Sequence, residues 1–453
     1  MVAPAGGSRH ILRSYELSGD SGDPDAVFRL PSPGDGGRRA VRKIRICLLS
    51  PPYSGHLNPL LGIGRELLPL AEVTVLSTPG AMRAVEAAGL RGYPIIREHE
   101  QLVLDIASPG QSVKGNPFLL FHQLKANVSL QTEVLEEVAA AMAELRPDLV
   151  IADFTLPVAG VAADRCGVPW WTHLPSPCVF ETPDGPPAYF GGLVPAEAPA
   201  ERVLHFLLRK ATRFFKRLMY FLFRGTFREV GLTSVYRQDG SERVYSPECI
   251  LVSAASEIEF PRTYPPHFQF IGPLLYTPPV EPEPPVFVDG KKHALVTLGS
   301  HLGHRKDEIA SAIRSLATGN PEWIFHFTDG NPQAGRCDGE GNFRRYPFIS
   351  YDLHLPRYDL VIHHGGSGVL HHCLKHGIPA VVMPMDFDQF DNAARLVWAG
   401  TAVRVDSLAD LPTAFRQAAG NPAMKTECQR FARMLGNYDT GARIRWMVSE
   451  KFP

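Results

Sequence analysis

Short apolar stretches rich in β-branched residues alternate with longer amphipathic stretches along most of the chain. The first runs from Ile44 to Leu49, and a turn rich in Pro, Ser and Gly leads into a helix-like segment and a second apolar stretch at 72–77. This order forms a βαβ unit, which implies a parallel sheet. Further strands are predicted at "DLVIAD" near 150, "VPWWTHL" near 170 and "CILVS" near 250, and the series ends near 268–273.

A proline-rich stretch, "PLLYTPPVEPEPP", separates this series from a second one. Its prolines disfavour both helix and central-strand pairing, as a stiff linker requires. Later strands are predicted at "HALVTLGS", "EWIFHF", "DLVIHH", "PAVVMP" and "TAVRV". The sequence therefore predicts an α/β protein with two Rossmann-like doubly wound domains that face a central cleft.

The predicted organisation has five parts. A disordered extension over 1–42 is followed by an N-terminal domain over 43–272, a linker over 273–290 and a C-terminal domain over 291–437. A C-terminal helix over 438–453 is expected to return to the N-terminal domain. The extension is rich in Gly, Pro, Ser and Arg and lacks the apolar core of a secretory signal.

Composition narrows the class of protein. The 453 residues carry a net charge of −1, which gives no support for a nucleic-acid partner, and 44% of them are hydrophobic, as in ordinary globular proteins. The 7 cysteines are scattered without a CxxC pair, which disfavours a disulfide framework and a zinc knuckle. A cytoplasmic location is expected, and no apolar run reaches the 18 residues of a membrane span.

Five histidines lie in "VIHHGGSGVLHHCLKHG" at 361–377, which raises the question of a metal site. His372 and His376 would share one face of a helix. Zinc needs a third ligand and usually a carboxylate base, and Cys373, Leu374 and Lys375 between them supply no carboxylate. No metal is therefore predicted here.

An anion-binding turn is the alternative interpretation of this stretch. A buried strand ends before His364, the turn Gly365, Gly366, Ser367, Gly368 follows, and a helix begins near Ser367. Free backbone N–H groups and the positive end of the helix dipole would point at one spot, and glycines let the backbone approach phosphate closely. His364 could donate a further hydrogen bond. A plain strand–helix connection would also use glycines, so the turn alone leaves both interpretations open.

A polar pair follows the next predicted strand. Asp388 and Gln389 in "MPMDFDQFDNA" stand where "PAVVMP" should lead into its helix, at the same sheet edge as the glycine turn. A carboxylate and an amide side by side suit adjacent sugar hydroxyls. The alternative is a helix-capping Asp. Asp386 and Asp388 also form a DxD, which we discount because the turn already offers charge compensation.

The stretch "FISYDLHLPRYDLVIHHGGSGVLHHCLKHGIPAVVMPMDFDQFDNA" resembles the donor-binding signature of family 1 nucleotide-sugar-dependent glycosyltransferases, which have the GT-B fold. The resemblance extends over the chain after residue 42. It implies that the N-terminal domain binds the acceptor and the C-terminal domain the donor. It also implies that His364 and the glycines after it bind the diphosphate.

The resemblance assigns further donor-binding residues. It implies that Asp388 and Gln389 bind the sugar, that Phe348 stacks on the base and that the backbone of Ile349 contacts the base edge. Ser300 in "TLGS" matches a serine that contacts the diphosphate. These assignments are what the family pattern implies, position by position.

Two positions depart from the family pattern. His372 stands where the family often has the Glu that holds the ribose hydroxyls, and Ser350 replaces a common proline. The replaced Glu leaves open whether the donor is a UDP-sugar or a dTDP-sugar. Neither departure removes the phosphate site.

The predicted catalytic pair lies in the N-terminal domain. His56 in "PPYSGHLNP" is expected in the loop after the first strand and resembles the family's catalytic histidine, with Asp153 in "VIADFTLP" matching its partner aspartate. A neutral imidazole can accept a hydroxyl proton, and a carboxylate can orient it. Taken singly, each residue has an ordinary alternative: His56 could be a surface histidine, and Asp153 could be a capping aspartate.

A basic, aromatic-rich stretch over 202–228, "RVLHFLLRKATRFFKRLMYFLFRGTFR", has three interpretations. It could contact an anionic membrane peripherally, line an apolar acceptor pocket, or pack on the domain. Packing or pocket lining is favoured, because amphipathic helices mostly cover cores. The segment "PECILVSAASEIEFPRTYPPHFQFIGPL" at 247–274 looks similar to bacterial enzymes that glycosylate lipophilic molecules, carotenoid glucosyltransferases among them.

The sequence as a whole predicts an inverting, metal-independent glycosyltransferase. It would move a sugar from a UDP- or dTDP-sugar to a hydroxyl of a lipophilic small molecule, with His56 as general base and no cofactor besides the nucleotide sugar. Two alternatives are a GT-B nucleotide-sugar epimerase, which needs no acceptor, and a non-catalytic partner protein that binds sugar nucleotides.

Overall fold

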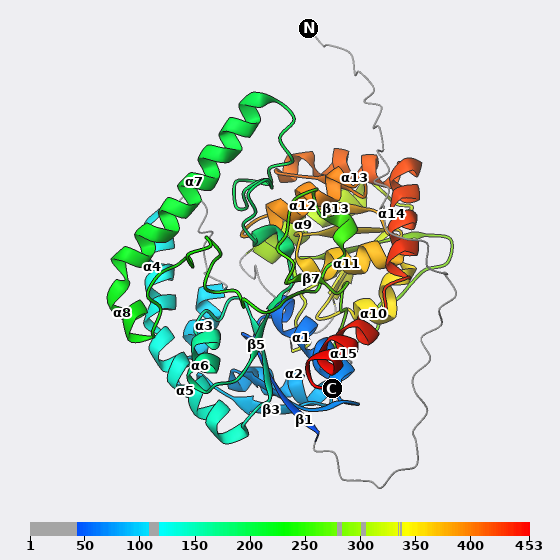
Figure 1. Ribbon diagram of the computed structural model, residues 1–453. Helices are drawn as coiled ribbons and strands as arrows, with labels where there is room; N and C mark the ends of the chain where they lie inside the picture. Colours follow the sequence, from blue (N-terminus) through cyan, green and yellow to red (C-terminus); the bar gives the residue numbers. More distant parts are fainter. Residues whose placement is uncertain (1–42, 108–116, 279–282, 300–304, 334, 336–337) are drawn as a thin grey trace, which may run out of the picture. The chain divides into compact units, whose positions relative to one another are not determined.

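The structure is a computed structural model that describes residues 43–107, 117–278, 283–299, 305–333, 335 and 338–453. Residues Lys43–Pro453 form one compact unit that contains two seven-stranded sheets (Figure 1). The extension expected over 1–42 lies outside the described residues. The domain boundaries expected at 272–273, 290–291 and 437–438 stay predictions.

The first sheet has the order β3-β2-β1-β4-β5-β6-β7, and all its strand pairs are parallel. Its central strands are short and buried on both faces, as a sheet covered by helices requires. The strands are β1 Ile44–Leu49, β2 Ala71–Ser77, β3 Arg91–Pro94, β4 Leu149–Asp153, β5 Trp170–Leu174, β6 Ile250–Val252 and β7 Phe268–Phe270.

The second sheet has the order β10-β11-β9-β8-β12-β13-β14. Its pairs are parallel except for the edge hairpin of β10 and β11, which is antiparallel. The strands are β8 Lys292–Thr297, β9 Trp323–Thr328, β10 Asp338–Glu340, β11 Phe343–Tyr346, β12 Leu360–His363, β13 Ala380–Val382 and β14 Ala402–Arg404. The predicted doubly wound α/β class is confirmed, with this one antiparallel hairpin added.

Helices connect the parallel strands. In the first half they are α1 Ser54–Leu67, α2 Met82–Ala87, α3 Glu100–Ala107, α4 Pro117–Ser129, α5 Gln131–Leu145, α6 Ala159–Arg165, α7 Pro199–Leu222 and α8 Arg224–Glu229. In the second half they are α9 Lys306–Thr318, α10 Tyr351–His354, α11 Ser367–His376, α12 Gln389–Trp398, α13 Leu411–Ala419, α14 Pro422–Leu435 and α15 Thr440–Lys451. None of the helices in the described ranges combines the length and the apolar content that crossing a bilayer requires.

Each sheet reverses its strand order at one point. In the first sheet the reversal lies between β1 and β4, and in the second it lies between β8 and β12. At such a switch point the connections leave toward opposite faces, which opens a crevice at the carboxyl ends of the strands. His56 follows β1, Asp153 ends β4 and His364 follows β12, so these predicted site residues lie at the two switch points.

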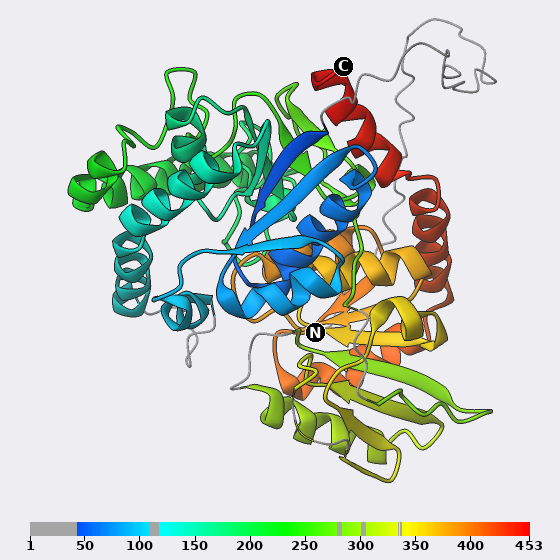
Figure 2. The same cartoon turned by 90° about the horizontal axis from the view of Figure 1, so that it is seen from below.

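The last helix, α15, packs against α1 (Figures 1 and 2). Ile444 and Val448 are fully buried in the same apolar cluster as Leu60 and Leu61 of α1. The side chain of Asp439 accepts a hydrogen bond of 2.7 Å from the backbone N–H of Ala442 at the start of α15. The carboxyl end of the chain therefore completes the core behind the first sheet.

Two predictions about local structure need correction. His56 does not lie in a loop: helix α1 already begins at Ser54, because the backbone N–H groups of His56 and Leu57 both donate to the carbonyl of Tyr53. The prolines and glycine of this segment suggested a loop, but Pro59 is accommodated inside the helix. Strands β3, β10 and β11 were not predicted, because they are short and largely polar.

The apolar side of α7 is largely exposed, so the stretch does not pack on the domain through that side. Its lining of an acceptor pocket stays a prediction. Of the residues of α7 only His205 is buried. Phe206, Phe214 and Phe221 are more than half exposed. The periodicity identified an amphipathic helix correctly, but its polar side is the one that faces the domain.

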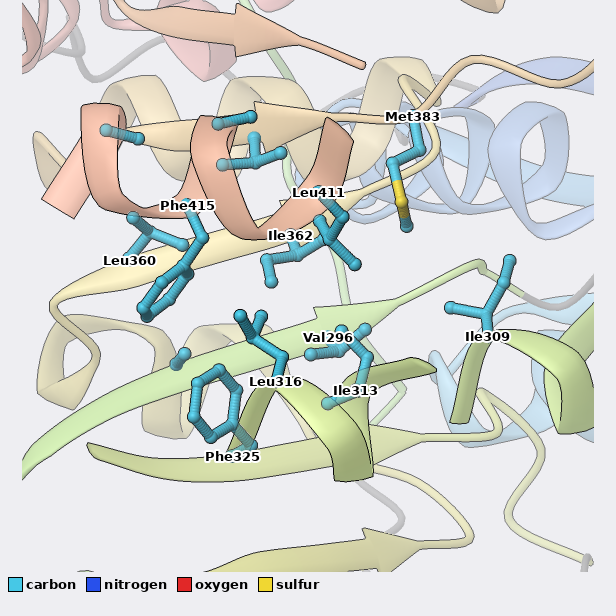
Figure 3. Close-up of a cluster of buried hydrophobic side chains, with 14 of the residues drawn as sticks. Val296, Ile309, Ile313, Leu316, Phe325, Leu360, Ile362, Met383, Leu411 and Phe415 are labelled. Carbon is cyan, nitrogen blue, oxygen red and sulfur yellow. The ribbon is translucent and has the colours of Figure 1, made fainter. Parts of the chain in front are cut away.

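The core of the second sheet offers a test of packing (Figure 3). Phe325 of β9 is fully buried among Leu316, Leu360 and Phe415. We expect Phe325→Ala to lower the free energy of unfolding by about 3–5 kcal/mol, because the cavity adds to the lost apolar burial. Urea denaturation followed by circular dichroism would measure this change.

The matched control is Phe214→Ala on α7, whose side chain is 68% exposed. It should change the free energy of unfolding by less than about 0.5 kcal/mol. Equal effects of the two substitutions would show that the core is not packed as described.

Candidate active site

His56 and Asp153 form a hydrogen-bonded pair at the switch point of the first sheet. The Nδ1 atom of His56 lies 3.0 Å from each carboxylate oxygen of Asp153. The Asp153 side chain is completely buried, while that of His56 is a quarter exposed. An Nδ1–H bond to the carboxylate fixes the tautomer and leaves the lone pair on Nε2, which suits the imidazole for accepting a proton.

Three further groups hold the carboxylate of Asp153. The backbone N–H and the hydroxyl of Thr155 donate to it at 3.0 and 2.6 Å. Nδ1 of His173, on the neighbouring strand β5, lies 3.4 Å away, and Nε2 of His173 lies 3.0 Å from the hydroxyl of Ser253. A buried carboxylate with this many donors keeps one orientation.

Electrostatics couple this pair to the other half of the chain. Burial disfavours the charged imidazole, but the carboxylates of Asp153 and Asp388 outweigh it and raise the pKa of His56. Burial also opposes ionisation of Asp153, yet His56 and the hydrogen bonds from His173 and His56 hold its pKa well below the usual range. Burial raises the pKa of Asp388, and the charge of His56 opposes that rise.

The glycine turn after β12 has the geometry expected of a backbone cradle. Gly365 has a φ of 96°, and a Cβ there would come 2.9 Å from the carbonyl oxygen of Gln389. The His364 ring lies against Gly366 and Gly299, since a Cβ on Gly366 would come 2.5 Å from His364 Nε2. A Cβ on Gly368 would meet nothing within 4 Å, so the space beside the start of α11 is open. Space, backbone N–H groups and an imidazole thus meet at one helix N-terminus.

Three other histidines of this stretch, His363, His371 and His372, are buried. Nδ1 of His363 accepts a hydrogen bond from the N–H of Gly365, and Nδ1 of His371 lies 2.8 Å from the carbonyl of Ser367. Burial lowers the pKa of His363 and His372 to about 3 and that of His371 to about 4. Among the residues that the structure describes, no three His, Cys, Asp or Glu side chains gather as metal ligands would.

Asp388 and Gln389 lie at the start of α12, beside the glycine turn. The amide oxygen of Gln389 accepts from the backbone N–H groups of Met385 and Asp386 at 2.9 and 3.1 Å, so it shapes its own loop. Asp388 accepts a 3.2 Å bond from the amide of Asn392, which also donates to the carbonyl of Gly365 at 2.9 Å. Asn392 therefore ties the glycine turn to the acidic residue.

Direct contacts join the carboxyl edges of the two sheets. The hydroxyl of Ser176, after β5, donates to the side-chain oxygen of Asn392 at 3.0 Å. The hydroxyl of Ser367 donates to the carbonyl of Pro175 at 2.6 Å. Helix α1, which carries His56, contacts α11, which follows the glycine turn. These contacts and the mutual effect of His56 and Asp388 put the histidine pair and the cradle in one site.

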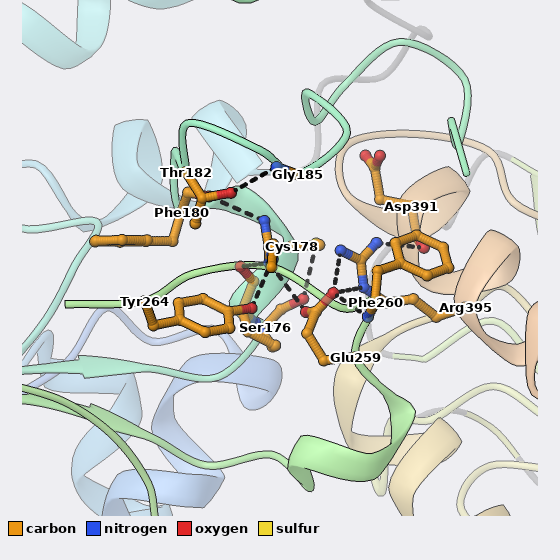
Figure 4. Close-up of polar contacts among 12 residues, drawn as sticks. Ser176, Cys178, Phe180, Thr182, Gly185, Glu259, Phe260, Tyr264, Asp391 and Arg395 are labelled. Carbon is orange, nitrogen blue, oxygen red and sulfur yellow. Dashed lines mark hydrogen bonds and ion pairs between the residues drawn. The ribbon is translucent and has the colours of Figure 1, made fainter. Parts of the chain in front are cut away.

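A buried ion pair reinforces this arrangement (Figure 4). Arg395 of α12 contacts Glu259, which follows β6, with its Nε at 2.8 Å and its Nη2 at 2.6 Å. Arg262 contacts the other oxygen of Glu259 at 3.0 Å. All three side chains are at least nine-tenths buried, so the pair is shielded from salt and solvent.

The remaining predicted residues have different positions. Phe348 is half-buried in the loop between β11 and α10, and the Ile349 side chain is buried in the core. Ser300 lies outside the described residues. His372 of α11 is buried, with its Nδ1 3.8 Å from a carboxylate oxygen of Asp352.

The sequence analysis missed several members of the site. His173, one residue before the end of β5, lies opposite Asp153 in the strand register, so its place near the end of a predicted strand could have identified it. Asn392 follows Asp388 by one helical turn, a spacing that puts both on one face. Ser176 gave no such indication, because its role depends on the approach of the other sheet.

Solved structures share this fold. The glycosyltransferase of kitacinnamycin matches 91% of this chain and 100% of its own, with a TM-score of 0.68 and 22% identity. The calicheamicin glycosyltransferase matches 90% of this chain and 98% of its own, with a TM-score of 0.67 and 20% identity. A Streptomyces glycosyltransferase complexed with thymidine diphosphate gives a TM-score of 0.60 at 17% identity, covering 90% of this chain and 99% of its own.

Curated relatives agree in class. The 4'-demethylrebeccamycin synthase of Lentzea aerocolonigenes is 25% identical over 402 residues, 85% of this chain and 94% of that protein. Human UDP-glucuronosyltransferase 2B10 is 28% identical over 319 residues, 64% of this chain and 58% of that protein. The chain thus spans little more than half the length of that human relative.

Fold and relatives together define the chain as a glycosyltransferase of the GT-B fold, of the small-molecule type that uses nucleotide sugars. The resemblance drawn from the sequence is confirmed. Within this class, residues 313–437 match the family described as erythromycin biosynthesis protein CIII-like, C-terminal domain.

The His56–Asp153 pair predicts a measurable titration. Asp153→Asn removes the charge that raises the pKa of His56 and keeps the burial that lowers it, so this pKa should fall. In the wild type the raised pKa contributes stability below the ordinary histidine pKa that is lost as pH rises through the raised value, and the variant should lack this contribution. Histidine C2–H NMR titration would measure the shift.

The His56 resonance can be assigned by its absence from the spectrum of His56→Ala. A His56 pKa that stayed constant or rose in Asp153→Asn would contradict the electrostatic account.

Proposed function

We propose that the chain transfers a sugar from a UDP- or dTDP-sugar to a hydroxyl group of a lipophilic small molecule, with inversion at the anomeric carbon. The observation that carries this proposal is the pairing of His56 with a buried carboxylate at one switch point, beside a glycine cradle at the other. The first supplies a proton acceptor and the second supplies a place for a leaving diphosphate.

The proposed reaction is a single displacement. Nε2 of His56 accepts the proton of the acceptor hydroxyl while its oxygen forms a bond to the anomeric carbon on the face opposite the diphosphate. The bond from that carbon to the phosphate oxygen breaks, and the nucleotide diphosphate leaves with the electron pair. Asp153 stabilises the imidazolium that forms.

The leaving group is proposed to rest on the cradle formed by Gly365, Gly366, Ser367 and Gly368. The N–H groups at the start of α11 and the His364 imidazole would offset the negative charge that develops. This source of charge compensation supports a reaction that needs no cofactor besides the nucleotide sugar. Asp388 and Gln389, beside the cradle, are proposed to contact the sugar hydroxyls. Ser300 is proposed to contact the diphosphate, Phe348 to stack on the base, and the backbone of Ile349 to contact the base edge.

Aromatic side chains around the histidine support a lipophilic acceptor. The Tyr53 ring stands edge-on to His56 with centroids 6.0 Å apart, and the Phe154 ring lies 5.8 Å away on a tilted plane. Rings in these positions could stack on an apolar acceptor and keep water from the nucleophile.

We expect His56→Ala to lower the transfer rate by about 10²–10⁴-fold, the usual contribution of a general base, without weakening nucleotide binding. Turnover would be measured with UDP- and dTDP-sugars and a panel of lipophilic alcohols, and binding by thermal shift with UDP and dTDP. His99→Ala, a substitution of a surface histidine, is the matched control and should leave both unchanged.

Near-normal transfer by His56→Ala would refute the assignment of the base. Conversion of the nucleotide sugar without acceptor, at the same rate in both proteins, would favour an epimerase. Nucleotide binding with no turnover in the wild type, across sugars and alcohols, would favour a non-catalytic partner protein.

The cradle has a separate test. Gly366→Ala places a methyl group 2.5 Å from Nε2 of His364, so the imidazole must move away from the turn. We expect the affinity for UDP or dTDP to fall about tenfold or more, because a hydrogen bond to a charged group contributes about 1.5–3 kcal/mol. Isothermal titration calorimetry would measure this loss.

Gly319→Ala is the matched control for the cradle test. Gly319 ends α9, and a Cβ there would meet only a carbonyl oxygen at 3.7 Å. It should retain wild-type affinity and melting temperature. Unchanged affinity in a folded Gly366→Ala protein would place the diphosphate elsewhere.

A further inference from the structure

Helix α7 lies at the periphery of the molecule (Figure 1), and it presents an apolar stripe to solvent. Its 24 residues extend over about 36 Å at 1.5 Å per residue. Val203, Phe206, Leu207, Phe214 and Phe221 are each between 51% and 68% exposed. At 100° per residue these five side chains fall within an arc of about 100°, so they form one continuous stripe. An apolar surface of this length on an isolated monomer is costly to leave in water.

The polar side of α7 is fixed on the domain. Nζ of Lys216 contacts the carboxylates of Glu181 and Glu242 at 2.6 and 2.8 Å. Arg209 donates to the carbonyl of Gly185 at 2.9 Å, and Tyr220 donates to the carbonyl of Leu232 at 3.2 Å. These contacts lie along the length of the helix and hold it in one rotation. The outward orientation of the apolar stripe is therefore built into the fold.

A row of basic residues lies among these apolar side chains. Lys210, Arg217 and Arg224 are spaced seven residues apart and are all exposed. At 100° per residue, the two on α7 fall within the arc of the stripe, between Phe206 and Val203. Nζ of Lys210 lies 5.3 Å from the Phe206 ring centroid, and the Arg224 guanidinium lies 4.5 Å from that of Phe221. The charges thus lie directly beside the exposed rings.

The outward side of α7 carries no acidic residue to balance this row. Glu201 is the one acidic residue in the helix sequence. Its carboxylate is committed to the helix start, where it accepts hydrogen bonds from the backbone N–H groups of Glu197 and Ala198. Next to the end of α7, the partly exposed Phe121 of α4 stacks on Phe223 with centroids 5.6 Å apart.

We propose that this face of α7 docks on an anionic lipid bilayer, with the helix lying in the plane of the headgroups. Aromatic and aliphatic side chains would enter the boundary between headgroups and acyl chains, while the basic row contacts lipid phosphates. A second copy of the chain is a poorer partner, because it would bring another basic row with no acidic counterpart. This inference rests on α7 and its surroundings and is independent of the proposed catalytic residues.

Vesicle flotation tests this proposal on the full chain. The probes are vesicles of phosphatidylcholine alone and vesicles with about one third phosphatidylglycerol. We expect binding to the anionic vesicles to exceed binding to the neutral ones at least about tenfold, and to weaken between about 0.1 and 0.5 M NaCl as charges are screened.

Two variants separate the apolar and charged contributions. Phe206→Ser/Phe214→Ser/Phe221→Ser removes the most exposed rings, and Lys210→Glu/Arg224→Glu reverses the charge of two residues of the row. Each should reduce binding to anionic vesicles at least about tenfold. Neither variant touches the contacts that fix α7, so melting temperature and nucleotide binding should stay at wild-type values. Arg83→Glu/Arg433→Glu, with the same change of charge at two other exposed sites, should bind like the wild type.

Several outcomes would overturn the proposal. These are no flotation of the wild type with anionic vesicles, equal flotation with neutral ones, and undiminished flotation of folded α7 variants. Light scattering after gel filtration tests the alternative that a second copy of the chain binds the stripe. A wild-type dimer without lipid that the triple Phe variant converts to monomer would show that a second copy covers the stripe.

Discussion

The buried carboxylate of Asp153 is the constraint on which the candidate site depends. A carboxylate without solvent is strongly destabilised unless charges and donors surround it. Here two imidazoles and both polar groups of Thr155 do so, from β5 and from the segments after β1 and β4. The carboxylate thereby holds His56 in one tautomer and one direction. The same contacts therefore stabilise the buried carboxylate and orient the imidazole of His56.

The two sheets present their carboxyl edges to a common site because polar groups link them. Ser176 and Asn392, Pro175 and Ser367, and Glu259 and Arg395 join residues more than 100 positions apart in sequence. Parallel sheets direct their loops to one edge, and the switch point in each sheet separates those loops. Two halves of the chain that are distant in sequence can then bring the His56–Asp153 pair and the glycine turn into one site.

Much of this could be predicted from local pattern. The strand Ile44–Leu49, the strand before His364 and the helix beginning at Ser367 follow from apolar runs and glycine turns. The short, polar strands at Arg91–Pro94 and Asp338–Glu340 did not, because their pairing depends on a neighbouring strand. The rotation of α7 was misjudged for a similar reason. Periodicity tells which residues share a face, but Glu181 and Glu242, distant in sequence, decide which face turns inward.

The packing of α15 has a consequence for the candidate active site. Ile444 and Val448 fill the space behind α1, and His56 stands in the first turn of that same helix. Helix α15 therefore supports the position of His56 through its packing on α1. Shortening α15 or changing its packing would weaken the support of α1. The contact between Nδ1 of His56 and Asp153 would then be less well defined, even with both of these side chains unchanged.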